Sequence, residues 1–216
     1  MSDSFDFKKE YKDLYLPPKK PVIIDIPEIT CIAVDGRGNP NTSAAYKNAI
    51  EVLYGLSYSI KMSKMNGTQP EGYFDYVLPP LEGFWTLDNG GFDYDGCRVT
   101  DKDKFVWTSF IRQPDFVTND VFERAKTVLA KKKPDVDLSH AKLVTFTEGL
   151  CVQIMHTGPY DTEPEDIQRM DAFAAANGYR PDFSEERRHH EIYLGDHRKT
   201  APEKLRTVIR HPVKKG

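Results

Sequence analysis

Two stretches decide the fold that we expect for this chain: Cys31–Gly36 (Cys-Ile-Ala-Val-Asp-Gly) and, about 120 residues later, Cys151–Gly158 (Cys-Val-Gln-Ile-Met-His-Thr-Gly). Each begins with apolar residues typical of a strand, ends at a glycine turn and precedes the start of a helix. The shared order predicts an α+β fold of two βαββ units with pseudo-twofold symmetry. Two sheets would then face each other, and the groove between them is the natural place for a central pocket.

The remaining elements follow from hydrophobic spacing and turn signals. A helix begins after Asn41 or Thr42, and a second begins near Thr118 and ends at Lys131–Pro134. The pair Thr162 and Glu165 fits a capping box at the start of a third helix. We expect strands at 29–34, 72–78, 81–87, 105–111, 143–146, 150–156 and 189–194, and a last segment that starts at 205–209. A turn at Thr147–Gly149 would separate two of these strands.

The domain organisation predicted from these elements is simple. Residues 1–20 are polar and end in a proline-rich run, which predicts an extended N-terminal segment with a short helical turn near Lys8–Leu14. Residues 21–216 form a single domain, with a first half at about 21–115 and a second half at about 140–213.

Composition excludes several classes of protein. The net charge is −3, with 30 basic and 33 acidic residues, so there is no basic field for nucleic acid. Apolar runs are too short to span a membrane, and the N-terminus lacks a signal peptide. Three cysteines (Cys31, Cys97 and Cys151) without C-x-x-C spacing argue against disulfides and zinc, which favours a reducing, cytoplasmic location.

Standard catalytic signatures are absent from the sequence. There is no phosphate-binding loop, dinucleotide fingerprint, zinc-protease helix or serine-hydrolase elbow. Neighbours on a strand point to opposite faces, so His189 and His190 are poorly placed to bind one metal ion. A strand cysteine such as Cys151 is usually an inert core residue. We therefore expect no metal and no cofactor.

The most informative stretch is Arg188–Asp196. As a strand, it places His189, Glu191 and Tyr193 on one face and His190, Ile192 and Leu194 on the other. The second face is typical of sheet packing. The first places a carboxylate between a histidine and a tyrosine, which fits either the solvent face of an edge strand or a cavity wall. In a cavity, Glu191 would need a cation or hydrogen bonds, and its pKa could be raised.

A second group of residues is aromatic: Tyr73, Tyr76, Phe84, Trp85 and Trp107. Flat aromatic walls stack on planar ligands and attract cations. The same residues could equally fill the core of a sheet.

Four runs resemble the GyrI-like small-molecule-binding domain proteins, and more narrowly their stand-alone bacterial members. They are His190–Val213 with the start His-Glu-Ile-Tyr-Leu-Gly-Asp, Tyr76–Trp85, Trp107–Pro114 and His156–Tyr160. Together they extend over nearly the whole chain. The resemblance implies the same two βαββ units around a central pocket. Relatives fused to transcription regulators bind lipophilic cations on a buried glutamate ringed by aromatic residues, and the matching glutamate here is Glu191.

The resemblance also implies a chemistry. Some stand-alone members are similar to hydrolases that open cyclopropane-bearing, DNA-alkylating natural products by adding water. Glu191 is then the expected catalytic base. The side chains expected to bind the substrate are Tyr73, Tyr76, Phe84, Trp85, Trp107, Met155, Tyr160 and Tyr193. This chain carries no recognisable helix-turn-helix segment, which argues against a regulator role.

Three functional hypotheses follow. The first is a detoxifying hydrolase, in which Glu191 activates water and Tyr193 or Tyr160 donates to the ligand's oxygen. The second is a non-catalytic multidrug or lipophilic-cation binder that keeps Glu191 ionised. The third is a protein-binding module, for which the sequence offers no long apolar stripe. In the first two the partner is a hydrophobic small molecule, and we expect a monomer or a weak homodimer.

Overall fold

A computed structural model describes residues 4–88, 91–93, 98–196 and 198–216. Its helices are α1 (Phe7–Glu10), α2 (Lys12–Tyr15), α3 (Ala44–Lys61), α4 (Asn119–Lys132) and α5 (Glu163–Ala176). Short 3-10 turns are η1 (Met62–Asn66), η2 (Lys102–Lys104), η3 (Tyr160–Thr162) and η4 (Pro202–Lys204). The strands are β1 (Phe5–Asp6), β2 (Val22–Arg37), β3 (Tyr76–Val77), β4 (Leu81–Leu87), β5 (Phe92–Asp93), β6 (Arg98–Val99), β7 (Phe105–Arg112), β8 (Ala141–Thr157), β9 (Tyr179–Pro181), β10 (His189–Tyr193) and β11 (Arg206–Lys215).

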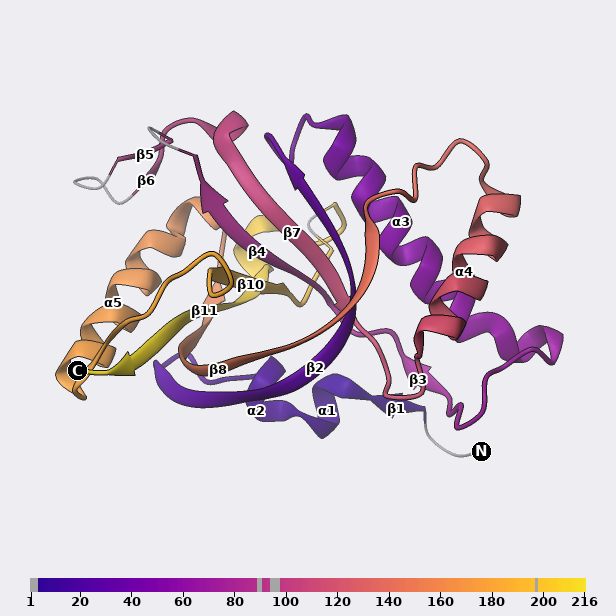
Figure 1. Ribbon diagram of the computed structural model, residues 1–216. Coiled ribbons are helices and arrows are strands. Elements are labelled where there is room, and N and C mark those ends of the chain that lie inside the picture. Colours follow the sequence, from indigo (N-terminus) through magenta and orange to yellow (C-terminus); the bar gives the residue numbers. More distant parts are fainter. Residues whose placement is uncertain (1–3, 89–90, 94–97, 197) are drawn as a thin grey trace.

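One seven-stranded antiparallel sheet organises the molecule, in the order β10-β4-β7-β2-β8-β11-β9. Strand β10 also pairs with β11, so that six of the strands close into a ring. The long, curved strands β2 and β8 run side by side across it (Figure 1). The mixed α/β fold is as predicted, but a single sheet replaces the two facing sheets. The chain order β2–α3–β4–β7 and β8–α5–β10–β11 is compatible with two units, and their twofold relation stays a prediction.

Helices cover the outer face of the ring on two sides. Helices α3 and α4 lie together on one side, and α5 lies on the other (Figure 1). Helix α3 is capped by Ser43, whose Oγ accepts from the backbone N–H of Tyr46. Its inward residues are fully buried, as the spacing predicts, except for the exposed Ala45: Ala49, Val52, Leu53, Leu56 and Ile60. Burying such a face is the main source of helix stability in a folded protein.

The N-terminal segment is part of the core. As predicted, short helices lie within residues 7–15, and Phe7, Leu14 and Tyr15 are buried against the inner face of the sheet beside Met155 and Ile192. Strand β1 pairs in parallel with β3. The proline-rich run that follows therefore connects two packed elements.

Three local predictions were wrong. Residues 141–157 form one strand, because β2 pairs with it on both sides of Gly149, whose φ of 71° bends the chain without a turn. Of the strand expected at 72–78, only Tyr76–Val77 pairs. The capping box is not formed, because the Thr162 hydroxyl donates to the carbonyl of Pro159.

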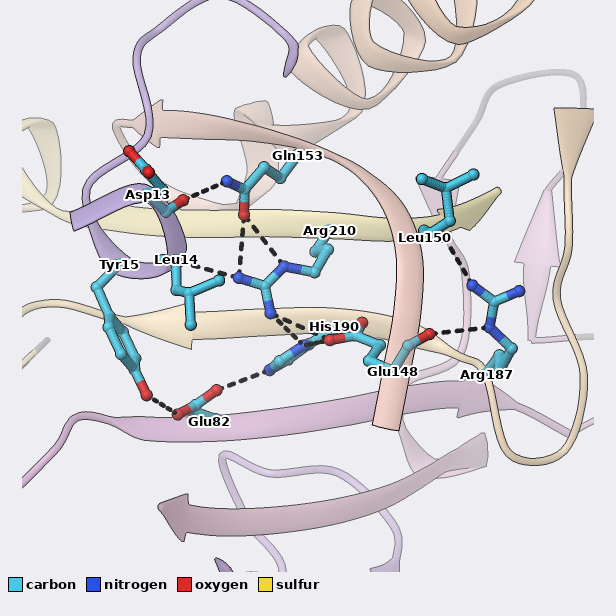
Figure 2. A network of polar contacts seen from close by, with 10 residues as sticks. All are labelled: Asp13, Leu14, Tyr15, Glu82, Glu148, Leu150, Gln153, Arg187, His190 and Arg210. Carbon is cyan, nitrogen blue, oxygen red and sulfur yellow. Dashed lines mark hydrogen bonds and ion pairs between the residues drawn. The ribbon is translucent and has the colours of Figure 1, made fainter. Parts of the chain in front are cut away.

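The ring's inner face holds a network of buried charges, shown in Figure 2. His190 lies between two carboxylates, with Nδ1 3.0 Å from Glu148 and Nε2 3.1 Å from Glu82. The guanidinium of Arg210 donates to Glu148 and Gln153, and also to the backbone carbonyl of Leu14. The network thus connects the N-terminal segment to four strands, β4, β8, β10 and β11.

This network corrects the prediction that His190 lies on an ordinary packing face. Burial alone would raise the pKa of Glu148, but the charges and hydrogen bonds of His190 and Arg210 outweigh it and lower the pKa to about 2. Burial lowers the pKa of His190, but the charge and hydrogen bonds of the two glutamates raise it more, so that the net change is a rise. The negative charge of Glu148 and the positive charges of His190 and Arg210 therefore stabilise one another.

Replacing Glu148 with glutamine should destabilise the protein by about 3–5 kcal/mol at pH 7, because it leaves the buried cations without their counter-charge. Since folding lowers the carboxyl pKa, the stabilisation is present above the unfolded pKa near 4.5 and is lost as the pH falls towards 2. Denaturant unfolding should therefore show a smaller difference between wild type and Glu148→Gln at pH 3 than at pH 7. The control is Glu123→Gln, which removes an exposed ion pair with Lys126 and should change stability little. An equal loss at both pH values would contradict the charge argument.

Candidate small-molecule site

A cavity of about 1940 Å³ lies on the outer face of the ring, between α3 and α5 and over strands β4 and β10. It occupies a different place from the predicted groove between two sheets. Its aromatic lining includes Tyr46 and Tyr54 from α3, Trp85 from β4, Tyr160 before α5 and Tyr193 from β10. The titratable groups that line it include Glu163, His189, Glu191 and His211. Apolar walls with a few convergent polar groups are typical of small-molecule sites.

Glu191 lies in this wall, and its side chain is only 15% exposed. Its Oε1 is 2.9 Å from Nε2 of His189, the preceding residue on the same face of β10. Burial pushes the pKa of Glu191 up, but hydrogen bonds from His189 and Tyr193 and the charge of both histidines give a net lowering. The carboxylate is therefore ionised at neutral pH, contrary to the raised pKa considered from the sequence.

Trp85 and Tyr193 form the wall beside Glu191. The indole Nε1 of Trp85 donates to the Tyr193 hydroxyl at 2.9 Å. Gly83 pairs with Glu191 across the strands, and a Cβ at that position would lie 2.7 Å from the indole nitrogen of Trp85. The glycine therefore leaves room for the indole, which lies over Gly83 of its own strand. Tyr46 contacts the Trp85 ring from α3, at a centroid distance of 5.9 Å.

Glu163 is a second carboxyl group in the cavity wall, and sequence analysis missed it. It is the first residue of α5 and is only 7% exposed. Its Oε1 has no hydrogen-bond partner among the residues that the structure describes. Burial, followed by the charge of Glu191, raises its pKa well above the usual range, which favours the protonated form. An acidic residue at a helix start is common, and only the packing of α5 distinguishes this one.

Four of the predicted site residues line the cavity: Glu191, Trp85, Tyr160 and Tyr193. The other five occupy different positions. Tyr76 and Met155 belong to the core around the N-terminal segment, and Tyr73 donates to the carbonyl of Lys61. Phe84 points to the inner face, where it contacts Phe110 and His190.

Trp107 is also buried, at 1% exposure, behind Tyr46. Its ring fills the space above Gly36, and its Nε1 donates to the carbonyl of Gly38. Alternation predicts which residues share a face, but it does not say which side of the ring that face lines. A ligand-binding role for these five residues has no support from their positions.

Neither described cysteine has a reactive environment. Cys31 and Cys151 are fully buried free thiols, and burial raises the pKa of both; Cys97 lies outside the described residues. Within the described ranges, no group of three or more His, Cys, Asp or Glu side chains is arranged to hold a metal ion. None of the described helices combines the length and apolar character needed to cross a membrane.

Comparisons with solved structures agree closely with this architecture. A crystal structure of a hydrolase from Listeria innocua is 47% identical, with a TM-score of 0.88, and the match covers 98% of this chain and 100% of that one. An uncharacterized conserved protein from the same organism is 50% identical, with a TM-score of 0.90 and the same coverage. The C-terminal domain of EcmrR shares the fold, at 16% identity and a TM-score of 0.50 over 91% of this chain and 98% of that domain.

The family assignment comes from a second comparison. No curated protein matches the chain. The family model of the GyrI-like small molecule binding domain, however, matches residues 19–214, which include both halves of the sheet and the cavity. This chain therefore belongs to the family of GyrI-like small molecule binding domain proteins.

Proposed function

We propose that this protein is a hydrolase that binds a planar, hydrophobic molecule in the cavity and opens a cyclopropane ring on it by adding water. The observation that carries the proposal is the pair of carboxyl groups in one aromatic cavity, where the pKa of Glu191 is lowered and that of Glu163 is raised well above its usual range. Two carboxyl groups whose pKa values diverge are suited to act as base and acid. The similarity to a Listeria innocua protein described as a hydrolase supports the same activity.

The lining of the cavity suits a flat ligand. Trp85 offers a ring face or edge from β4, and Tyr46 and Tyr54 offer theirs from α3. Aromatic stacking contributes about 0.5–1.5 kcal/mol per pair beyond the burial of area. A toxin that alkylates DNA commonly carries such a planar, apolar body, which would be held here with its reactive ring near Glu191.

The proposed reaction is an addition of water to a cyclopropane conjugated with a dienone. Glu191 takes a proton from water, and the water oxygen forms a bond to a cyclopropane carbon. The carbon–carbon bond of the strained ring breaks, and its electron pair moves into the dienone. The dienone oxygen becomes a phenol by taking a proton from Glu163. One water is consumed: its oxygen and one hydrogen form the new hydroxyl group, and its other hydrogen passes to Glu191. The cycle closes when Glu191 releases that proton to solvent and Glu163 takes up one from solvent.

The tyrosines have different capacities to assist. The Tyr193 hydroxyl is hydrogen-bonded to Glu191, so its single proton is already committed. Tyr160 lies at the rim, 37% exposed, with its ring 6.1 Å from that of Tyr193. Of the two tyrosines considered from the sequence, Tyr160 is therefore the better donor to a ligand oxygen.

A second candidate function is favoured by the ionised state of Glu191. An anionic carboxylate among aromatic rings also suits a lipophilic cation, which would bind without reacting. In that case the charge of Glu191 would contribute to affinity, and no product would form. The two functions differ in what a neutral residue at position 191 does.

Glu191→Gln should lower turnover of a cyclopropane-bearing DNA alkylator by about 10²–10⁴-fold and leave its binding nearly unchanged. The side-chain amide keeps the shape of the carboxylate but cannot take a proton. Mass spectrometry of the water adduct measures turnover, and quenching of the fluorescence of the two tryptophans, of which Trp85 lines the cavity, measures binding. Glu165→Gln, an exposed change on the same helix as Glu163, is the matched control. Normal turnover in Glu191→Gln would exclude the proposed role, and loss of binding to a planar cation without any product would favour the binder.

The same substitution should lower the pKa of Glu163 towards its usual range, because the charge of Glu191 is the second largest cause of its rise after burial. Carbon-13 NMR of the Glu163 carboxyl group during a pH titration would measure the shift. Glu165→Gln should leave that titration unchanged. A Glu163 carboxyl that titrates at its ordinary pH in the wild-type protein would refute its assignment as the acid.

A further inference from the structure

Three consecutive hydrogen bonds connect Glu191 to Asp171 on α5. Oε1 of Glu191 is 2.9 Å from Nε2 of His189, and Nδ1 of His189 is 2.8 Å from Nε2 of His211. Nδ1 of His211 is 3.1 Å from Oδ1 of Asp171. Both nitrogens of each imidazole ring take part in these hydrogen bonds, so that each ring has one partner on either side.

The path leads from the cavity wall to solvent. The side chains of Glu191 and His211 are 15% and 8% exposed, whereas that of Asp171 is 46% exposed. His189 and His211 lie on the paired strands β10 and β11, and Asp171 projects from α5, which packs on the same face. The ring of Phe183 covers His211 at a centroid distance of 5.0 Å. The path thus runs through partly buried groups, with the His189 side chain 21% exposed, and ends at the more exposed Asp171.

The geometry of these hydrogen bonds fixes the number of protons that the four groups share. Three hydrogen bonds need three hydrogens, but two neutral imidazoles carry only two N–H groups. Between two ionised carboxylates, one imidazole must therefore be protonated. Burial, with the charge of His189, lowers the pKa of His211 against the opposing hydrogen bond to Asp171. Of the two arrangements that satisfy all three hydrogen bonds, this favours the one with the extra proton on His189. His189 then donates in both directions, and His211 donates to Asp171.

We propose that Glu191, His189, His211 and Asp171 form a proton relay between the cavity and solvent. The relay rests on the proposed function, in which Glu191 takes a proton from water. When it does so, His189 transfers its Nδ1 proton to Nε2 of His211, and His211 transfers its Nδ1 proton to Asp171, which releases it. Glu191 and His189 both become neutral, so the total charge stays constant. After the product leaves, Asp171 takes up a proton from solvent and the two imidazoles return it to His189, while Glu191 releases the proton that it took from water into the open cavity, which restores the resting state.

The groups around the relay are compatible with this direction of transfer. Glu191 also faces Tyr193 on its own strand, Tyr46 on α3, and Tyr160 and Glu163 near the start of α5. The pKa values of the tyrosines and of Glu163 are all raised, which favours their protonated forms and disfavours them as competing proton acceptors. The charge of His190 lies across the strand. The pKa of His211 is also influenced by the charge of Glu148 on the inner face, in addition to Asp171 and His189.

The relay can be tested without any substrate by nitrogen-15 NMR of the histidine rings in the full chain. The spectrum at neutral pH should contain three ring N–H protons for His189 and His211 together. Asp171→Asn should shift the ring signals of His189, two hydrogen bonds away, and lower the pH at which His189 loses its proton. The matched control is Asp166→Asn, because Asp166 contacts His156 in a separate pair at 2.9 Å; it should shift only His156. Two ring protons, or a His189 spectrum unchanged by Asp171→Asn, would overturn the relay.

Kinetics of the cyclopropane substrate give a second readout. Asp171→Asn and His211→Gln should lower kcat with little change in KM. Both should also alter the pH profile of kcat and the solvent isotope effect on kcat. Neither should lower kcat further in a Glu191→Gln background, because the relay acts through Glu191. Equal losses in both backgrounds would show a merely structural role. If the wild-type protein does not turn the substrate over, the hydrolase proposal fails, and the NMR result still decides whether the four groups share a proton.

Discussion

The structure depends on the pairing of β10 with two neighbours at once, β4 on one side and β11 on the other. This pairing closes the ring and gives every strand a defined inner and outer face. Successive residues of β10 must then enter different environments, His190 inside and Glu191 outside. The short strand His189–Tyr193 therefore carries both the central group of the core network and the central group of the cavity.

Each environment satisfies its charge in a different way. Inside, His190 is enclosed by Glu82 and Glu148, whose cost of burial is offset by the cations His190 and Arg210 and by their hydrogen bonds. Outside, Glu191 has His189 as its nearest partner, and Glu163 shares the same cavity. Two carboxylates in one apolar cavity cannot both be ionised cheaply, and the histidine decides which one keeps its charge. The divergence of their pKa values thus follows from the position of one imidazole.

Much of this arrangement was predictable from local signals. The helix starting at Ala44, the lysines that end α4 and the alternation of residues 189–193 all depend on short-range spacing. Glu191 was selected because alternation placed it between His189 and Tyr193. The family resemblance, confirmed over residues 19–214, supplied the expectation of a pocket.

What could not be predicted depends on contacts between distant residues. The alternation of Phe84 and Trp85 in β4 is clear, but only closure of the ring decides that Trp85 lines the cavity and Phe84 faces His190. The polar N-terminal segment gave no sign that the Leu14 carbonyl would meet Arg210, 196 residues away. Glu163 acquires its raised pKa from the packing of α5, which no local pattern encodes.

The two adjacent histidines show why the side of the ring matters for function. His190 is completely buried between two glutamates, so its proton has no path to exchange and it acts as a fixed charge. His189 also has a carboxylate partner on one ring nitrogen, that of Glu191. Its other ring nitrogen, however, contacts His211, which can itself accept a proton. A carboxylate at that position would have held the proton as firmly as Glu148 does. Replacing it with an imidazole that ends at the exposed Asp171 turns the same arrangement of charges into one whose proton can leave, as a base that must be reset after each turnover requires.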